Sequence, residues 1–356
     1  MGGDMNLAII EKEGLHLFVA ELLRRKNTVV GVKDQSAVSS IPGDSGFYTY
    51  APINSPEETT LSFDVTLIPP KKYLLPAYEQ LLTFNLSPGS IKADAPKEEL
   101  IIFGVHPYDI IAINQMDKVF SAVPQDNHYL ERRKRTTIIG IDPVKVAPRA
   151  FWSSMGADTV ASGFDLMLTD IGQCYVVDVG STKGASLLKM APRTREAAPA
   201  EVKERDKVRA EARKRCDANR LKFSYLELPS LLDGKEEHVI WEEKSYLCFS
   251  CGTCNLVCPT CYCFDVRDDV SIDLKKGSRY RTWDGCLLSD FAQVAGGGNF
   301  RGHRADRYRH RFYRKGQFIY RRFGDIACVG CGRCSAQCPS DIADPVTVFN
   351  RLKEGI

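Results

Sequence analysis

Cysteine is the residue type whose spacing points to chemistry in this chain, because eight of its thirteen cysteines form two copies of one pattern. Each copy reads C-x-x-C-x-x-C-x-x-x-C-P, at residues 248–259 and 328–339. Three thiolates on such a tight loop can bind three iron corners of a [4Fe–4S] cubane, and the fourth usually binds the cluster of the other copy. The doubled pattern therefore predicts two [4Fe–4S] clusters close enough to exchange electrons. The candidate ligands are Cys248, Cys251, Cys254, Cys258, Cys328, Cys331, Cys334 and Cys338.

Two other uses of these cysteines fit the pattern less well. Structural zinc sites use two separated pairs of ligands, whereas four cysteines within eleven residues crowd too many thiolates around one tetrahedral ion. Disulfides need an oxidising compartment, and this chain has an odd number of cysteines and no apolar signal segment at its start. Iron–sulfur ligation is favoured, and with it we expect a reducing cytoplasmic location in an anaerobe.

Three further cysteines, Cys261, Cys263 and Cys286, lie in the segment between the two runs. They are either buried thiols that pack as small apolar groups, a third metal site, or substitute ligands for one of the first two clusters. The sequence leaves these alternatives open. Cys174 and Cys216 stand alone, and we expect both to be inert thiols.

The composition is that of an ordinary globular protein of more than one domain. The chain has 356 residues, of which 44% are hydrophobic and 26% are charged, with a formal net charge of +3. No segment approaches the roughly eighteen apolar residues of a membrane span. The sequence contains no glycine-rich nucleotide motif, so a nucleotide site of its own is not indicated.

Residues 1–195 alternate between strand-like and helix-like patterns, which predicts an α/β domain with a mixed sheet that serves as a scaffold or docking domain. We expect a hairpin over 165–180 that turns at Gly172 and Gln173. The other expected strands are 28–32, 46–50, 61–66, 99–105 and 136–142, and the expected helices are 15–25, 77–84 and 107–120.

The remaining chain divides into a connector at 196–240 and a two-cluster, ferredoxin-like domain at 241–356. Within the connector, 14 of the residues 201–222 carry charge, which predicts a solvated helix with one thin apolar stripe. The two cysteine runs are separated by 69 residues, so the insertion at 264–327 has room for several helices. Taken together, the chain is expected to have an α+β fold with a mainly helical cluster domain.

The insertion also carries a basic and aromatic stripe. Residues 279–322 contain eleven Lys and Arg against three Asp. The cations could stabilise the anionic clusters, dock an acidic partner subunit, or bind nucleic acid. The first two explanations are favoured, because a nucleic-acid-binding protein seldom needs two clusters in electronic contact.

Several longer motifs resemble those of the β subunit of sulfhydrogenases, which are cytoplasmic nickel–iron hydrogenase and sulfur reductase complexes, and of the related A subunit of anaerobic sulfite reductase. In the second half the resemblance is carried by both cysteine runs and by three further motifs. These are CPTCYCFDV at 258–266, WDGC at 283–286 and VAGGGNFR at 294–301. In the first half it is carried by FGVHPYD at 103–109, SSMG at 153–156 and GFDLMLTD at 163–170.

The resemblance implies an electron-transfer subunit that is not itself catalytic. Such a subunit bridges a flavin-containing, NAD(P)H-binding subunit and a terminal catalytic subunit such as a hydrogenase or a sulfur or sulfite reductase. A second interpretation is that the chain also lines a flavin or substrate site at a subunit interface, and a third is a nucleic-acid-binding protein with a structural cluster. By position in the motif, Cys248, Cys251, Cys254 and Cys338 would bind one cluster, and Cys328, Cys331, Cys334 and Cys258 the other.

Overall fold

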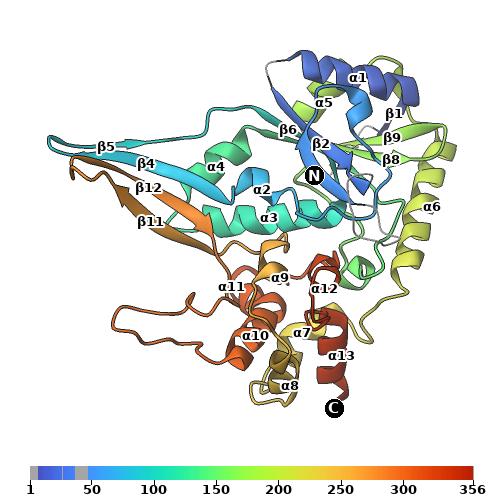
Figure 1. Cartoon of the computed structure of the whole chain (residues 1–356). Helices are drawn as coiled ribbons and strands as arrows, with labels where there is room; N and C mark the ends of the chain where they lie inside the picture. Colours follow the sequence, from blue (N-terminus) through green and yellow to red (C-terminus); the bar gives the residue numbers. More distant parts are fainter. Residues whose placement is uncertain (1–6, 26, 37–46, 356) are drawn as a thin grey trace.

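The computed structural model describes residues 7–25, 27–36 and 47–355 of the chain. The fold is α+β. A large mixed sheet with flanking helices is built from the first half, a four-stranded sheet projects from the body, and a helical region contains both cysteine runs (Figure 1).

The large sheet has eight strands in the order β10-β1-β9-β8-β7-β6-β2-β3. Its centre is parallel, because β2, β6, β7 and β8 run in one direction, and the outer pairs are antiparallel. Strands β6 and β7 are buried along their whole length, as expected for continuous apolar runs in the middle of a parallel sheet. The strands are β1 (Leu7–Glu11), β2 (Thr28–Asp34), β3 (Tyr48–Pro52), β6 (Leu100–Val105), β7 (Thr136–Ile141), β8 (Leu166–Asp170), β9 (Cys174–Val179) and β10 (Thr194–Glu196).

The helices of the first half connect and cover these strands. The predicted hairpin is present as β8 and β9, and the predicted helix after Pro107 is α3, which begins at that proline. Gly172, in the hairpin turn, has a φ of 93° that favours glycine. The helices are α1 (Lys12–Arg24), α2 (Lys71–Leu74), α3 (Pro107–Ser121), α4 (Asn127–Lys134) and α5 (Thr182–Leu188), with short 3₁₀ turns at Pro56–Glu58 and Trp152–Met155.

Three predictions from local sequence pattern were wrong. Residues 77–84 form part of strand β4 (Tyr78–Leu86) and not a helix, because they pair with a strand almost 200 residues later in the chain. Residues 61–66 are not a strand and make only one isolated bridge, from Thr66 to Tyr48. The insertion does not begin with helices, because its first twenty residues form a β-hairpin, β11 (Phe264–Val270) and β12 (Lys276–Trp283).

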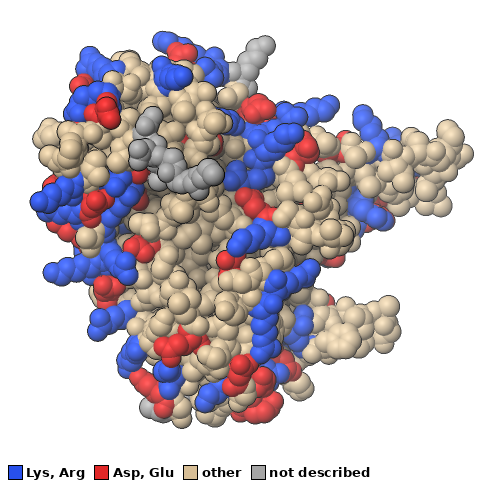
Figure 2. All heavy atoms as spheres, turned by 180° about the vertical axis from the view of Figure 1, so that it is seen from behind, with Lys and Arg blue, Asp and Glu red and all other residues tan. Residues whose placement is uncertain are grey.

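This hairpin builds the projecting sheet together with β4 and β5 (Gly89–Ala93), in the order β11-β12-β4-β5. The sheet therefore combines strands from both halves of the chain. At its base, the buried Arg281 contacts the carboxylates of Glu79 and Asp126. A second projection is the loop between β12 and α10 (Arg304–Tyr313), and seen from behind the outer ends of both projections are largely free of charged side chains (Figure 2).

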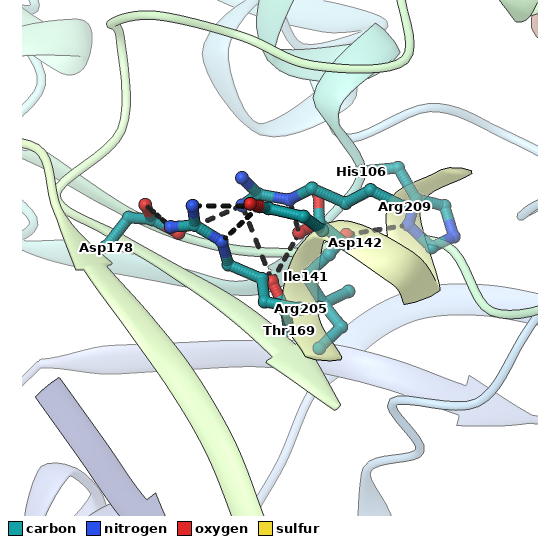
Figure 3. A network of polar contacts seen from close by, with 8 residues as sticks. His106, Ile141, Asp142, Thr169, Asp178, Arg205 and Arg209 are labelled. Atoms are coloured by element: carbon teal, nitrogen blue, oxygen red, sulfur yellow. Dashed lines mark hydrogen bonds and ion pairs between the residues drawn. The ribbon is translucent and has the colours of Figure 1, made fainter. Parts of the chain in front are cut away.

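The charged connector forms helix α6 (Pro199–Cys216), and two of its arginines do not point into solvent. Arg209 donates to Asp142 at 2.7 Å and to Asp178 at 2.9 Å, and Arg205 donates to Asp178 at 2.7 Å (Figure 3). Thr169 completes this network through Asp142. The helix thus docks on strands β7–β9 through buried ion pairs, which a count of its charged residues could not distinguish from a solvated face.

The C-terminal part consists of short helices around the two cysteine runs. None of the helices in the described ranges is long and apolar enough to cross a membrane. The elements not yet named are α7 (Leu228–Leu231), α8 (Ile240–Tyr246), α9 (Thr253–Leu256), α11 (Ile319–Phe323), α12 (Arg333–Ala336) and α13 (Pro345–Glu354), with a 3₁₀ turn at Tyr225–Glu227 and a π-helical turn at Arg314–Phe318.

Candidate metal centres

The eight cysteines of the two runs line two separate cavities, four to each. The first cavity is lined by the first three cysteines of the first run and by the last cysteine of the second run. These residues are Cys248, Cys251, Cys254 and Cys338. Cys251 is exposed at the surface, whereas Cys248 and Cys254 are buried.

The second cavity has the reciprocal composition. It is lined by Cys328, Cys331 and Cys334 of the second run and by Cys258, the last cysteine of the first run. Each run thus contributes three cysteines to its own cavity and one to the other cavity. This exchange is the arrangement that two-cluster ferredoxin motifs produce.

The two runs reach this arrangement with the same backbone conformation. Gly252 and Gly332 occupy equivalent positions and have φ values of 72° and 78°, after which α9 and α12 begin. The residues two positions earlier, Ser250 and Gly330, also have positive φ. Such left-handed residues turn the chain so that cysteines three residues apart can face a common point.

The donor set and its surroundings fit an iron–sulfur cluster in each cavity. Within the described ranges, no three Cys, His, Asp or Glu side chains converge closely enough to hold a single metal ion. The four cysteines instead surround a space, as the ligands of a multi-iron cluster must. Burial raises the pKa of Cys254 and of Cys331 to about 12, so these thiols ionise only when a metal takes the place of the proton.

Two buried cations stand beside the cysteines without an acidic partner. Arg311 of α10 lines both cavities, and Lys315 lines the second. Neither is paired with a carboxylate in the part of the chain that the structure describes, and Nε and one terminal nitrogen of Arg311 have no hydrogen-bond partner there. Among the described residues, the ammonium of Lys315 donates only to the hydroxyl of Thr260, at 2.7 Å. Buried cations require a counter-charge, which an anionic thiolate-bound cluster would provide.

The charge of Arg311 depends on the neighbouring sulfur atoms. Burial opposes its charge, but negative charge on the sulfur atoms around it, those of Cys254 and Cys334 first, raises its pKa well above the ordinary value. The structure therefore favours the first of the three explanations for the basic stripe, since two of its cations face the cavities. Others are paired within the protein: Arg279 with Asp268, Arg281 with Glu79 and Arg321 with Asp233.

The second run is anchored on the first half of the chain. Arg333, between two of its cysteines, is fully buried and makes two 2.7 Å hydrogen bonds to Asp109 of α3. It also donates to the backbone oxygen of Thr66 at 2.7 Å. The backbone oxygen of Gly330 accepts a hydrogen bond from the amide of Phe151 at 2.8 Å. The second cavity is thus held at the junction of the two halves.

The three cysteines between the two runs line neither cavity. Cys261 and Cys286 are buried, and Cys263 is half-buried. Of the two isolated cysteines, Cys216 is the last residue of α6 and is buried in the core, and Cys174 lies in β9.

Comparison with known proteins agrees with this architecture. Residues 247–342 match the family model of the 4Fe–4S dicluster domain, so this region carries two [4Fe–4S] clusters. Sulfhydrogenase 2 subunit beta of Pyrococcus furiosus is 32% identical over 313 residues, which cover 87% of this chain and 90% of that protein. The chain belongs to the family of sulfhydrogenase β subunits, and it is an iron–sulfur subunit related to hydrogenases.

Sequence reasoning found the cysteines but missed the individual residues around them. In the sequence, Arg311 and Lys315 stand out only as members of a basic stripe, although their spacing of four residues, continued back to Arg307, indicates that they share one helix face. No local sequence pattern indicates that Asp109 pairs with Arg333, because the two residues lie 224 positions apart in the chain. Nor does one indicate that Asn255 and Lys71 contact the region of Cys261.

Proposed function

We propose that this chain is the electron-transfer subunit of a multi-subunit oxidoreductase and is not itself catalytic. In this proposal, Cys248, Cys251, Cys254 and Cys338 bind one [4Fe–4S] cluster, and Cys328, Cys331, Cys334 and Cys258 bind the other. The observation that carries the proposal is the pair of reciprocal four-cysteine cavities with Arg311 between them. A bound [4Fe–4S] cluster supplies a one-electron couple, and two neighbouring couples form a relay.

The unequal exposure of the two centres supports an orientation for the relay. Cys251 of the first centre is at the surface, and beside it Tyr246, Leu247 and Phe249 expose apolar side chains. The second centre lies deeper, against Phe151 of the first half. We infer that a redox partner docks at the first centre.

The proposed partners are a flavin-containing, NAD(P)H-binding subunit and a terminal catalytic subunit such as a hydrogenase or a sulfur or sulfite reductase. The relative from Pyrococcus furiosus is named as a subunit, which supports a role within a complex. Thiolate-bound clusters suit a reducing compartment, so the proposal includes a cytoplasmic location. Residues 1–195 would act as the scaffold or docking domain, 196–240 as the connector and 241–356 as the cluster domain.

The proposal is tested on anaerobically purified full-length chain, alone and with its co-purifying subunits. We expect the chain alone to show reducible clusters by electron paramagnetic resonance but no turnover with NAD(P)H, hydrogen or sulfite. In the complex, Cys334→Ser is expected to remove the second cluster and abolish electron transfer between the partner subunits. Cys216→Ser, a buried cysteine outside both cavities, is the matched control. Turnover by the single chain would overturn the proposal and favour a catalytic role at an interface.

A further inference from the structure

The projecting hairpin brings together three cysteines that the two-centre arrangement does not use. Cys261 and Cys263 directly precede β11, and Cys286 follows β12. The ladder of the hairpin begins at the pair Phe264 and Trp283, and just beyond it the amide of Asp284 donates to the backbone oxygen of Cys263 at 3.0 Å. The hairpin therefore closes at its base and holds cysteines that are more than twenty residues apart in sequence at one place.

Asn255 connects two of these cysteines. Its side-chain nitrogen lies 3.4 Å from the Sγ of Cys286 and 3.7 Å from the Sγ of Cys261. Asn255 is only 1% exposed, and its side-chain oxygen has no hydrogen-bond partner in the part of the chain that the structure describes. A buried amide oxygen without a donor costs about 1–3 kcal/mol, so its persistence here calls for a reason.

A buried cation of the first half faces the same place. Lys71 of α2 is 2% exposed, and its Nζ donates to the backbone oxygen of Cys261 at 2.8 Å. The same ammonium lies 4.4 Å from the ring centroid of Trp283, at the end of β12. No carboxylate pairs with Lys71 among the described residues, and Lys71 lines neither of the two cavities. Its ammonium lies within electrostatic reach of the sulfur atoms of Cys261, Cys258 and Cys263, so its charge faces this group of cysteines as well as one cysteine of the second cavity.

A second unpaired cation lies nearby. The guanidinium of Arg314 stands 4.5 Å from the ring centroid of Tyr262, the residue between Cys261 and Cys263. Like Lys71, it has no carboxylate partner within the described ranges. Two cations from different elements thus lie beside this group of thiols. An anionic metal–thiolate group at this place would compensate both cations.

We propose that Cys261, Cys263 and Cys286 hold a third iron–sulfur cluster at the base of the β11–β12 hairpin. Three thiolates can hold three iron corners, as each run does in its own cavity. Cys261 follows Cys258 by three residues, so the third cluster would neighbour the second and extend the proposed two-centre relay.

The first test is the iron and acid-labile sulfide content of the full-length chain purified anaerobically. Two clusters require about eight iron atoms per chain, and a third raises the count to about eleven or twelve. We expect Cys286→Ser and Cys263→Ser each to lower the iron content by three or four atoms, with the signals of the other two clusters retained in the reduced protein. Cys174→Ser and Cys216→Ser are matched controls that should leave iron unchanged.

A second measurement needs no variant that could fail to fold. Cys263 is half-buried, so in the native wild-type chain a thiol reagent should alkylate it if it is free and spare it if it binds iron. We expect protection that is lost after iron chelation, as read by mass spectrometry of the labelled peptide. Lys71→Met, which keeps every cysteine, should make one of three reduction potentials more negative and leave the iron content unchanged.

Three results would overturn the proposal. The first is an iron content of about eight atoms in the wild-type chain that does not fall in Cys286→Ser. The second is rapid alkylation of Cys263 in the native protein. The third is one zinc ion per chain that is absent from Cys286→Ser. Loss of the second cluster in Cys261→Ser would instead make Cys261 a substitute ligand, and it would also refute a third site. Because a working two-cluster relay is compatible with each of these results, they leave the proposed function intact.

Discussion

At the scale of single residues, the centres are defined by buried cations as much as by cysteines. A buried guanidinium or ammonium without a carboxylate is rare in a folded protein, because its desolvation is not compensated. Arg311, Lys315 and Lys71 are of this kind, and all three lie beside cysteines. Their positions therefore indicate where the negative charge of the bound clusters lies.

Arg311 should tune both centres, because it lines both cavities. We expect Arg311→Gln to make the reduction potentials of both clusters more negative, since the reduced, more anionic state loses a nearby positive charge. The shift is expected to be on the order of 100 mV at protein-like dielectric. Arg311→Lys should recover most of it, and Arg309→Gln, on the same helix but paired with Asp306, is the control. Redox titration followed by electron paramagnetic resonance measures the shifts, and equal potentials in the Gln and Lys variants would contradict the electrostatic role.

His106 should make the stability of the first half depend on pH. The imidazole is fully buried, stacks on Phe63 and shares a hydrogen bond with the backbone oxygen of Ile141 at 3.0 Å (Figure 3). Burial lowers its pKa from 6.5 to about 4. Between pH 6.5 and pH 4, the unfolded chain therefore binds a proton at this histidine that the folded chain does not bind. The contribution of the neutral His106 to stability is fully present above pH 6.5 and is lost as pH falls towards 4.

The full effect is about 3 kcal/mol, of which roughly 1 kcal/mol should already be lost at pH 5.5. His106→Phe removes the titrating group, so its unfolding free energy should fall less between pH 7.5 and pH 5.5 than that of the wild type. Urea unfolding at both pH values, followed by tryptophan fluorescence, gives the comparison. Ile110→Val is the control, because it changes a buried residue without removing a titratable group. An equal fall in unfolding free energy between the two pH values in wild type and His106→Phe would refute the role of His106.

At the scale of elements, the second cysteine run is more tightly docked than the first. A Cβ added to Gly332 would meet the backbone of Arg149 at 2.6 Å. A Cβ added to Gly252, the equivalent residue of the first run, would meet only the side chain of Leu288 at 3.0 Å. The two glycines share a left-handed backbone, so they differ mainly in what lies against them.

This pair of glycines gives a matched experiment. Both alanine substitutions carry the cost of a left-handed conformation, about 1–2 kcal/mol. Gly332→Ala must also push the run away from the first half, so we expect it to lose the second cluster, whereas Gly252→Ala should retain both clusters. Iron content and the spectrum of the reduced protein measure the difference. Equal iron content in the two variants would show that the docking of the second run is not rigid.

The elements also show what could be predicted from sequence. The two runs were recognisable because their signal is local, with four ligands in eleven residues. Strand β4 was mistaken for a helix because its partner, β12, lies almost 200 residues later, and a local pattern cannot report such pairing. The same holds for Arg209, whose charge looked solvated until Asp142 and Asp178 were found beneath it. The role of a charged residue depends on the groups that it contacts in the folded chain, and the local sequence does not show these contacts.

At the scale of the whole molecule, two of the exposed apolar regions on the described surface have different places in the fold. One, the port patch, consists of Tyr246, Leu247 and Phe249 next to the exposed Cys251. The other is the outer part of the projecting sheet, where Ile91 and Ile272 are exposed. The port patch adjoins the first cavity, whereas no residue of the projecting sheet lines either cavity, so we expect a partner's redox group to approach at the port patch.

Substitutions in the two regions should therefore have different consequences. We expect Phe249→Ser, with a side chain that is 72% exposed, to slow electron transfer between this chain and its partner at least tenfold, because partners use exposed aromatic residues as anchors. Its iron content and spectrum should match the wild type. Ile91→Ser, with a side chain that is 76% exposed, should leave the transfer rate unchanged once the complex has formed. Stopped-flow reduction of the clusters in the assembled complex distinguishes the two, and equal rates in both variants would place the electron port elsewhere on the surface.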